Sequence, residues 1–158
     1  GQYLSRSAAA VPMSTYSQEH TGVVREIRTH AVVTVVTGYG DMKAPPAVVS
    51  ALWDTGAYSS VVTQNVVTAL GLRPIDHVRA CGVNGWYEAP VYIIDLMLPN
   101  KMKVANLLVS LGTMTAADML IGMDVISMGD FKLINDGKTS FSIRTPSEGD
   151  VPFVPTVN

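Results

Sequence analysis

The apolar residues of this chain come in short runs, rich in valine and other β-branched side chains, that end at glycine, proline or asparagine. Runs of this length form β-strands more readily than helices, which need about ten or more periodic residues. The chain is therefore predicted to be all-β, as a barrel or a sandwich. Strands are expected over residues 23–28, 31–37, 47–53, 75–81, 86–98, 103–111, 118–121, 131–134 and 139–143.

Two short helices and two hairpin turns interrupt these runs. Thr63 can cap a helix that ends before Gly71, and residues 123–128 predict one or two helical turns. Residues 82–85 contain Asn-Gly, a strong tight-turn dipeptide, and are expected to join two strands as a hairpin. A second hairpin is expected around residues 135–138.

The 158 residues suit a single folded domain with an extension at each end. Residues 1–21 are polar without a sustained period, and we expect a flexible N-terminal arm there. Residues 22–144 hold the predicted strands and form the domain. Residues 145–158 carry three prolines and acidic residues, and we expect an extended C-terminal tail.

Composition excludes several classes of site and partner. A net charge of −2 without runs of lysine or arginine gives no reason to expect nucleic acid. The lone cysteine, Cys81, excludes an intrachain disulfide framework and a cysteine-rich zinc site, and none of the three histidines belongs to a metal-ligand pair. No apolar run approaches the roughly 18–20 residues of a membrane span. No signal peptide is visible, so the cytoplasm is the default compartment, although an upstream targeting segment could have been removed.

The residues most suited to chemistry are Asp54, Thr55 and Gly56, which follow the apolar run 47–53 directly. A carboxylate between two core-type segments is costly unless it is paired, hydrogen-bonded or functional. Thr55 can donate and accept hydrogen bonds, and Gly56 leaves its backbone open to close approach. Asp-Thr-Gly is also ordinary turn chemistry, so an unrelated β-barrel with a fortuitous match stays an alternative.

The segment 52–57, Leu-Trp-Asp-Thr-Gly-Ala, resembles the active-site turn of aspartic proteases in its retropepsin, or retroviral-type, form. Residues 119–126, Met-Leu-Ile-Gly-Met-Asp-Val-Ile, are similar to the apolar-apolar-Gly-x-Asp segment that runs from strand into helix beneath that turn. Residues 82–85 stand in the place of the family's flap hairpin. The resemblance covers roughly residues 23–144. It implies a closed, barrel-like acid-protease half-fold with one or two short helices.

The resemblance also implies a function, an aspartic endopeptidase that hydrolyses peptide or protein bound in an extended conformation, without metal or cofactor. Its chemistry needs two facing carboxylates, one that takes a proton from water and one that is protonated and polarises the scissile carbonyl. The chain holds a single Asp-Thr-Gly, and Asp136-Gly137 lacks the apolar run before it. A symmetric homodimer that places Asp54 opposite its copy would complete the site.

Further roles follow from the same resemblance, position by position. Thr55 would form hydrogen bonds across the dimer axis, and Gly56 would let the substrate backbone pass the carboxylates. Ala57 and the flap would contact the bound peptide, and the flap would close over it and exclude water. The flap residues are Cys81, Gly82, Val83, Asn84 and Gly85.

Two alternatives stay open. The chain could be a catalytically silent, retropepsin-like dimerisation or peptide-binding module, although intact Asp54, Thr55 and Gly56 argue against a decayed site. Asp124 could belong to a network beneath the turn, or it could be an acid in a first helical turn, favoured by the helix dipole. We prefer the second interpretation and leave Asp124 outside the catalytic set.

Overall fold

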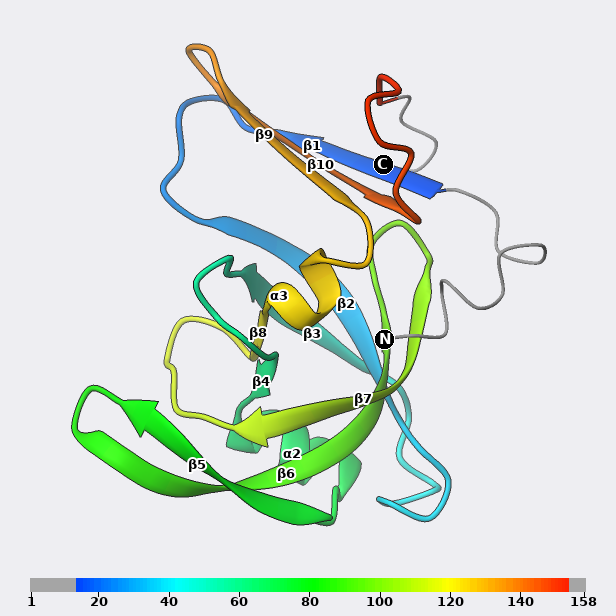
Figure 1. Ribbon diagram of the computed structural model, residues 1–158. Coiled ribbons are helices and arrows are strands. Elements are labelled where there is room, and N and C mark those ends of the chain that lie inside the picture. Colours follow the sequence, from blue (N-terminus) through cyan, green and yellow to red (C-terminus); the bar gives the residue numbers. More distant parts are fainter. Residues whose placement is uncertain (1–13, 154–158) are drawn as a thin grey trace.

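The computed structural model describes residues 14–153, and they form an almost entirely β structure (Figure 1). Strands make up 49% of the described residues, and the described helices are two short ones, so the all-β prediction is confirmed. In chain order the elements are β1 (Ser14–Glu19), β2 (Ile27–Val35), β3 (Ala47–Trp53), β4 (Val61–Val62), α2 (Gln64–Leu70), β5 (Asp76–Gly82), β6 (Gly85–Met97), β7 (Lys103–Leu111), β8 (Met119–Ile121), α3 (Met123–Ile126), β9 (Asp130–Asn135) and β10 (Thr139–Thr145).

Six strands close into a barrel, as the resemblance implied. They belong to a sheet of order β2-β3-β8-β4-β7-β6-β5, and β2 also pairs with β6, from Val32 opposite Met97 to Val35 opposite Ile94. The barrel therefore has no free edge between β2 and β6. Strand β5 lies outside the closed ring and pairs only with β6, so these two strands project together as a hairpin (Figure 1).

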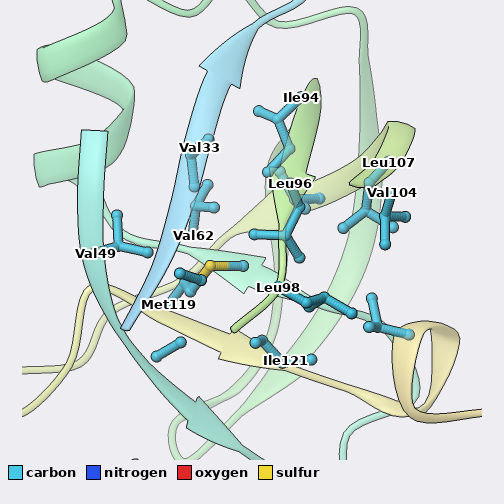
Figure 2. Packing of buried hydrophobic residues seen from close by; sticks show 14 of the residues in the cluster. Val33, Val49, Val62, Ile94, Leu96, Leu98, Val104, Leu107, Met119 and Ile121 are labelled. Atoms are coloured by element: carbon cyan, nitrogen blue, oxygen red, sulfur yellow. The ribbon is translucent and has the colours of Figure 1, made fainter. Parts of the chain in front are cut away.

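The barrel interior is filled by aliphatic side chains from every wall strand (Figure 2). Successive side chains of a strand point to opposite faces, so every second residue faces inward. In β2, for example, Ile27, Ala31 and Val33 are buried, whereas His30 between them is exposed. Helix α2 buries Val66, Val67 and Leu70 against the barrel and ends at Gly71 in a left-handed conformation, which confirms the predicted helix and its stop signal. The fully buried aliphatic residues include Val33, Val62, Ile94, Leu96, Val104, Met119 and Ile121.

A second, three-stranded sheet of order β1-β10-β9 lies beside the barrel (Figure 1). Three aromatic rings join the two parts. The Trp53 ring, at the end of β3, lies 5.4 Å from Phe141 of β10 and 6.1 Å from Phe131 of β9, measured between ring centroids. The Trp53 indole also donates a hydrogen bond of 3.0 Å to Thr29 Oγ1. This cluster fixes the small sheet against the strand that leads into Asp54.

The N-terminal arm is partly ordered, which corrects the prediction of a flexible segment over residues 1–21. Ser14–Glu19 forms β1, which pairs antiparallel with β10 along its whole length. The segment is polar because it is an edge strand, where backbone hydrogen bonds provide the pairing and only one face is covered. Ser17 Oγ, for instance, lies 2.8 Å from Ser142 Oγ across the pair. Residues 1–13 lie outside the described residues.

The two strands predicted over residues 23–28 and 31–37 are also corrected, because one continuous strand, β2, replaces them. Residues 20–26 instead cross from the small sheet to the barrel, and the Val24 N–H donates a hydrogen bond to Thr139 Oγ1. The valines at 23 and 24 gave a strand-like pattern without a neighbouring strand to pair with.

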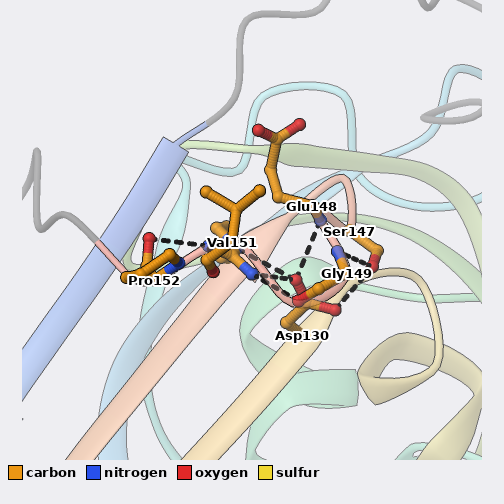
Figure 3. Close-up of polar contacts among 7 residues, drawn as sticks. Asp130, Ser147, Glu148, Gly149, Val151 and Pro152 are labelled. Atoms are coloured by element: carbon orange, nitrogen blue, oxygen red, sulfur yellow. Dashed lines mark hydrogen bonds and ion pairs between the residues drawn. The ribbon is translucent and has the colours of Figure 1, made fainter.

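The C-terminal segment is not an extended tail. Thr145 ends β10, and residues 146–153 fold back over Arg144, whose side chain is fully buried (Figure 3). The Arg144 guanidinium donates to the carbonyls of Gly149, Val151 and Pro152, forms an ion pair of 2.6 Å with Asp130, and lies 4.1 Å from the centroid of the Phe153 ring. A buried guanidinium needs acceptors for its five N–H groups, and the returning chain supplies them. Residues 154–158 lie outside the described residues.

The Asp130 carboxylate should make stability depend on pH. Burial by itself raises the pKa of Asp130. The hydrogen bonds from Ser147, the Glu148 N–H and Arg144, together with the Arg144 charge, lower this pKa by more, so it lies below the ordinary value of 3.8. This carboxylate therefore stabilises the folded state fully above the unfolded pKa, and that stability is lost as pH falls through the folded pKa.

We expect Asp130→Asn to lower the free energy of unfolding at pH 7 by about 2 kcal/mol. It should also flatten the decline of that free energy below about pH 4. Urea unfolding at pH 7 and pH 3 measures both, with Asp136→Asn in the exposed β9–β10 turn as the control. A decline as steep in Asp130→Asn as in the wild type would contradict this role.

Candidate active site

Asp54 stands at the end of β3, where the chain leaves the barrel wall in a tight turn. Its N–H donates a hydrogen bond of 2.9 Å to the Ile121 carbonyl at the end of β8, the parallel neighbour of β3. Its carbonyl accepts one of 3.2 Å from the Ala57 N–H. Asp54 is half-buried, whereas Thr55 and Gly56 are exposed. The strand ends therefore hold the carboxylate at the surface with its backbone fixed.

Gly56 is required by the position of that carboxylate. The Gly56 N–H donates a hydrogen bond of 2.8 Å to Asp54 Oδ1. A Cβ atom on Gly56 would lie 3.2 Å from the same oxygen, tighter than most such contacts in proteins. A side chain here would therefore crowd the Asp54 carboxylate, whereas glycine leaves one face of it open.

The segment from β8 into α3 runs directly against this turn, as the sequence predicted for residues 119–126. The Met123 N–H donates a hydrogen bond of 2.8 Å to the Ala57 carbonyl. A Cβ atom on Gly122 would lie 2.8 Å from that carbonyl oxygen and 2.9 Å from the carbonyl of Ser59. Only glycine fits at position 122, because the two backbones touch there.

Asp124 belongs to a hydrogen-bond network beneath the turn, so our preference for a simple first-turn acid is corrected. Its Oδ2 accepts a hydrogen bond of 2.9 Å from the Ser60 N–H, and its Oδ1 accepts one of 2.8 Å from Ser60 Oγ. Ser60 Oγ in turn accepts one of 3.1 Å from the Gly122 N–H. Asp124 Oδ1 also accepts the Val125 N–H of its own helix. The carboxylate thus ties α3 to the chain that follows the Asp54 turn.

The predicted flap residues form one hairpin tip. Cys81 pairs with Trp86 and Gly82 with Gly85, and a two-residue turn of Val83 and Asn84 joins β5 to β6. Gly85 has a φ of 103°, which favours glycine, and the Val83 side chain is fully exposed. A hollow of about 430 Å³ lies at this tip, lined by residues 82–87 and by Thr113, which follows β7.

The predicted site residues therefore fall into two groups within one chain. Asp54, Thr55, Gly56 and Ala57 form the turn, and residues 81–85 form the hairpin tip; the hollow at the tip includes none of the turn residues. The sequence analysis did not predict the aromatic residues beside the two groups. Their position directly after the two motifs in the sequence could have indicated them. They are Tyr58, which is 95% exposed, and Trp86 and Tyr87, which line the hollow.

Within residues 14–153, no group of three or more histidine, cysteine, aspartate or glutamate side chains is placed to hold a metal ion. No helix in this part of the chain has the length and apolar character needed to cross a membrane.

Comparison with known proteins gives a family match. A family model described as "gag-polyprotein putative aspartyl protease" matches residues 41–128, more than half of the chain. The matched region contains the Asp54 turn, the β5–β6 hairpin, Gly122 and Asp124. No curated protein matches the chain.

Solved structures similar to this chain include three proteases. A retropepsin-like aspartic protease from Rickettsia conorii matches with a TM-score of 0.53 and 16% identity, over 85% of this chain and 98% of that one. The EIAV protease in complex with the inhibitor HBY-793 matches with a TM-score of 0.49 and 17% identity, over 65% and 86% of the two chains. The simian foamy virus protease matches with a TM-score of 0.45 and 18% identity, over 64% and 92%. The first of these shows that the fold is retropepsin-like.

Removing the Asp124 carboxylate should destabilise the fold, because it leaves the Ser60 N–H and hydroxyl without their acceptors. We expect Asp124→Ala to lower the free energy of unfolding by about 1–3 kcal/mol, and Asp124→Asn, which keeps acceptor oxygen, to lower it less. Urea unfolding at neutral pH measures both changes. Asp136→Ala, at an exposed turn position, is the control, and a loss in Asp124→Ala no larger than in that control would contradict the network's role.

Proposed function

The chain belongs to the gag-polyprotein aspartyl protease family and has a retropepsin-like fold, and from this premise we propose that it is a homodimeric aspartic endopeptidase. The observation that carries the proposal is the Asp54 carboxylate itself. It stands at the surface on a turn fixed by β8, with Gly56 leaving one side of it open. Each chain supplies one such carboxylate.

One carboxylate is half of a catalytic pair. In the proposed mechanism an ionised Asp54 takes a proton from a water molecule, which attacks the scissile carbonyl, while the protonated Asp54 of a second copy polarises that carbonyl. Two carboxylates about 3 Å apart cannot both be ionised, because like charges at that distance repel strongly, so the pair shares one proton. A homodimer with a twofold axis at the turn meets this requirement with one gene product.

The exposed turn residues have roles that suit this arrangement. We assign Thr55, whose side chain is exposed, to hydrogen bonds across the dimer axis that hold the two turns together. The exposed Gly56 backbone would run alongside an extended peptide, and Ala57 would contact its side chains. A peptide in an extended conformation offers unpaired backbone N–H and C=O groups for such contacts.

The β5–β6 hairpin is proposed as the flap. Strand β5 and residues 85–90 of β6 lie beyond the pairing of β6 with β7 and β2, so this part of the hairpin can move without opening the barrel core. Its tip, residues 81–85, would close over the bound peptide and exclude water, and the hollow of about 430 Å³ beside Thr113 would accept part of the substrate.

Asp54→Asn is expected to abolish peptide cleavage while leaving the fold and the dimer intact. The amide matches the carboxylate in shape, but it cannot act as a base or hold the shared proton, so the rate should fall about 1,000-fold or more. Cleavage of a peptide library, read by mass spectrometry, and sedimentation of the same samples measure both properties. Asp136→Asn is the matched control, since it also changes an aspartate that precedes glycine in a turn.

Mixing the two forms tests whether the site is shared. Excess Asp54→Asn chains should lower the activity of each wild-type chain, because mixed dimers hold one carboxylate, and dilution of the wild type should lower its specific activity. A monomer with full specific activity would contradict the shared site. A wild-type dimer without any cleavage would instead favour the silent, peptide-binding module.

Gly85→Val is expected to impair turnover if the hairpin is the flap. Valine at a φ of 103° strains the tip by about 1–3 kcal/mol, although nothing lies within 4 Å of the new Cβ atom. The matched control is Gly38→Val, because Gly38 has a φ of 91° and equally open surroundings in the loop before β3. We expect kcat/KM to fall about tenfold or more in Gly85→Val alone, and equal activities in the two variants would contradict the assignment of the flap.

A further inference from the structure

We propose that Arg28 is a positioning residue for peptide binding, because it holds the loop that faces the flap across the hollow at the hairpin tip. This loop, residues 112–118, joins β7 to β8. The inference rests on the proposed function, since it names a residue that controls how tightly the same site binds its peptide. Arg28 does not line the hollow, so it acts through the loop.

The β7–β8 loop lies opposite the flap tip (Figure 1). Thr113 of this loop lines the hollow of about 430 Å³, and the other described lining residues, 82–87, all belong to the hairpin. A peptide side chain in the hollow would therefore be held between the hairpin and the loop. A loop that must first be ordered lowers the affinity for a ligand, so a contact that fixes the loop beforehand raises it.

The two ends of this loop are fixed by backbone hydrogen bonds. The Gly112 N–H donates a hydrogen bond of 2.9 Å to the Val62 carbonyl. At the other end, the Asp118 N–H donates one of 2.8 Å to the Ser50 carbonyl. Residues 113–117, between these ends, form no backbone hydrogen bond with another residue that the structure describes. The middle of the loop therefore depends on contacts with side chains.

Arg28 supplies a polar contact to the middle of the loop. Its Nη1 donates a hydrogen bond to the Ala116 carbonyl and another, of 2.9 Å, to Ser50 Oγ. The bond to Ala116 is the one hydrogen bond that joins residues 113–117 to the rest of the described chain. Ala117 is buried and adds an apolar contact. Without the guanidinium, this segment would keep only apolar packing between its two fixed ends.

The strand register explains why Arg28 reaches the loop. Ile27 and Thr29 of β2 are buried, and successive side chains of a strand point to opposite faces, so Arg28 leaves the barrel on its outer face. Arg28 lies opposite Leu52 of β3, and Ser50, two residues before Leu52, is on the same face. The guanidinium thus crosses the outside of β3 toward the start of β8, where the loop ends.

The direction of the guanidinium is set by its other partners. Arg28 Nε and Nη2 both donate to Glu26 Oε2, at 3.0 and 2.7 Å. An exposed ion pair of this kind adds little stability, but it orients the planar donor group. The Ser50 N–H also donates a hydrogen bond of 2.8 Å to Asp118 Oδ2. Strand β3 therefore holds both Arg28 and the end of the loop.

Arg28 is separate from the proposed catalytic pair. Among the described residues, its hydrogen-bond partners include neither the Asp54 turn nor the hairpin. The hollow likewise contains none of the turn residues. A peptide contact that is weakened there is weakened equally before and during the reaction, which raises KM and leaves kcat unchanged. A residue that acted on the carboxylates would change kcat instead.

Peptide kinetics of Arg28→Met test this assignment, because methionine keeps an apolar stem and removes every donor. For a peptide identified by cleavage of the library, we expect KM to rise about tenfold or more and kcat to stay within about threefold. The matched control is Arg73→Met, since Arg73 also donates to a loop carbonyl, that of Gly38 before β3. Both constants should stay within about threefold in the control. An unchanged KM in Arg28→Met, or a fall in kcat alone, overturns the inference.

The mobility of the loop gives a second measurement that needs no activity. A nitroxide spin label on Thr115→Cys, combined with Cys81→Ser so that no other thiol remains, reports the motion of the loop. We expect the electron paramagnetic resonance spectrum to narrow when Arg28→Met is added and to stay unchanged when Arg73→Met is added. Circular dichroism melting checks that each variant folds. An unchanged spectrum in the folded Arg28→Met protein overturns the inference.

Arg28→Lys serves where Arg28→Met does not fold. A single ammonium group cannot reproduce the planar fork that serves Glu26, Ser50 and Ala116 together. KM and loop mobility should therefore rise in Arg28→Lys as well, by a smaller factor. Wild-type values of both in Arg28→Lys would overturn the inference in that case.

Binding in an Asp54→Asn background separates this inference from the proposed function. Library peptides retained by Asp54→Asn are labelled with fluorescein, and anisotropy gives their Kd with and without Arg28→Met. A Kd that rises about tenfold supports the inference, even where the wild type cleaves no peptide and the proposed catalysis fails. Cleavage by the wild type, with Kd and KM unchanged by Arg28→Met, overturns the inference and leaves the proposed function standing. A wild type that neither binds nor cleaves any peptide overturns both.

Discussion

The close contact between the Asp54 turn and Gly122 is the constraint on which the candidate site depends. Two backbone segments touch there with no room for a Cβ atom, and the Met123 N–H donates to the Ala57 carbonyl across the contact. Strands β3 and β8 run parallel into this point, so the barrel wall fixes the turn together with the hydrogen bonds within it. The Asp54 carboxylate can therefore stand at the surface in one position, which the proposed catalysis requires.

Polar and aromatic contacts extend that constraint into the rest of the chain. Beneath the turn, Asp124 accepts the N–H and hydroxyl of Ser60, which joins α3 to the chain after the turn. On the other side, Trp53 packs against Phe131 and Phe141, which ties the small sheet to the same strand end. A shift of the small sheet would therefore be transmitted to Asp54, since close-packed protein interiors yield little.

The molecule is divided into a closed barrel, a projecting hairpin and an attached sheet. The barrel holds the Asp54 carboxylate, the tip of the β5–β6 hairpin is paired only within itself, and the small sheet packs against the end of β3 through Trp53. The C-terminal return covers Arg144 near the end of β10 and also contacts β9, because the Glu148 N–H donates to Asp130 and the Phe153 ring lies 5.2 Å from Lys132 Nζ. Family membership and fold thus agree with an aspartyl protease.

The sequence by itself determined the local elements and the motif. The short apolar run over residues 47–53 predicted β3, where the structure has it, and Gly71 marked the end of α2, because these signals depend on neighbours in the chain. Tertiary structure alone decided the rest. Residues 14–19 become a strand only because β10 lies beside them, Arg144 draws the following residues back because it is buried, and Asp124 finds its partner Ser60 at a distance of 64 residues. Such contacts join segments far apart in the chain. They produce no periodic pattern in the local sequence, so they could not be predicted from it.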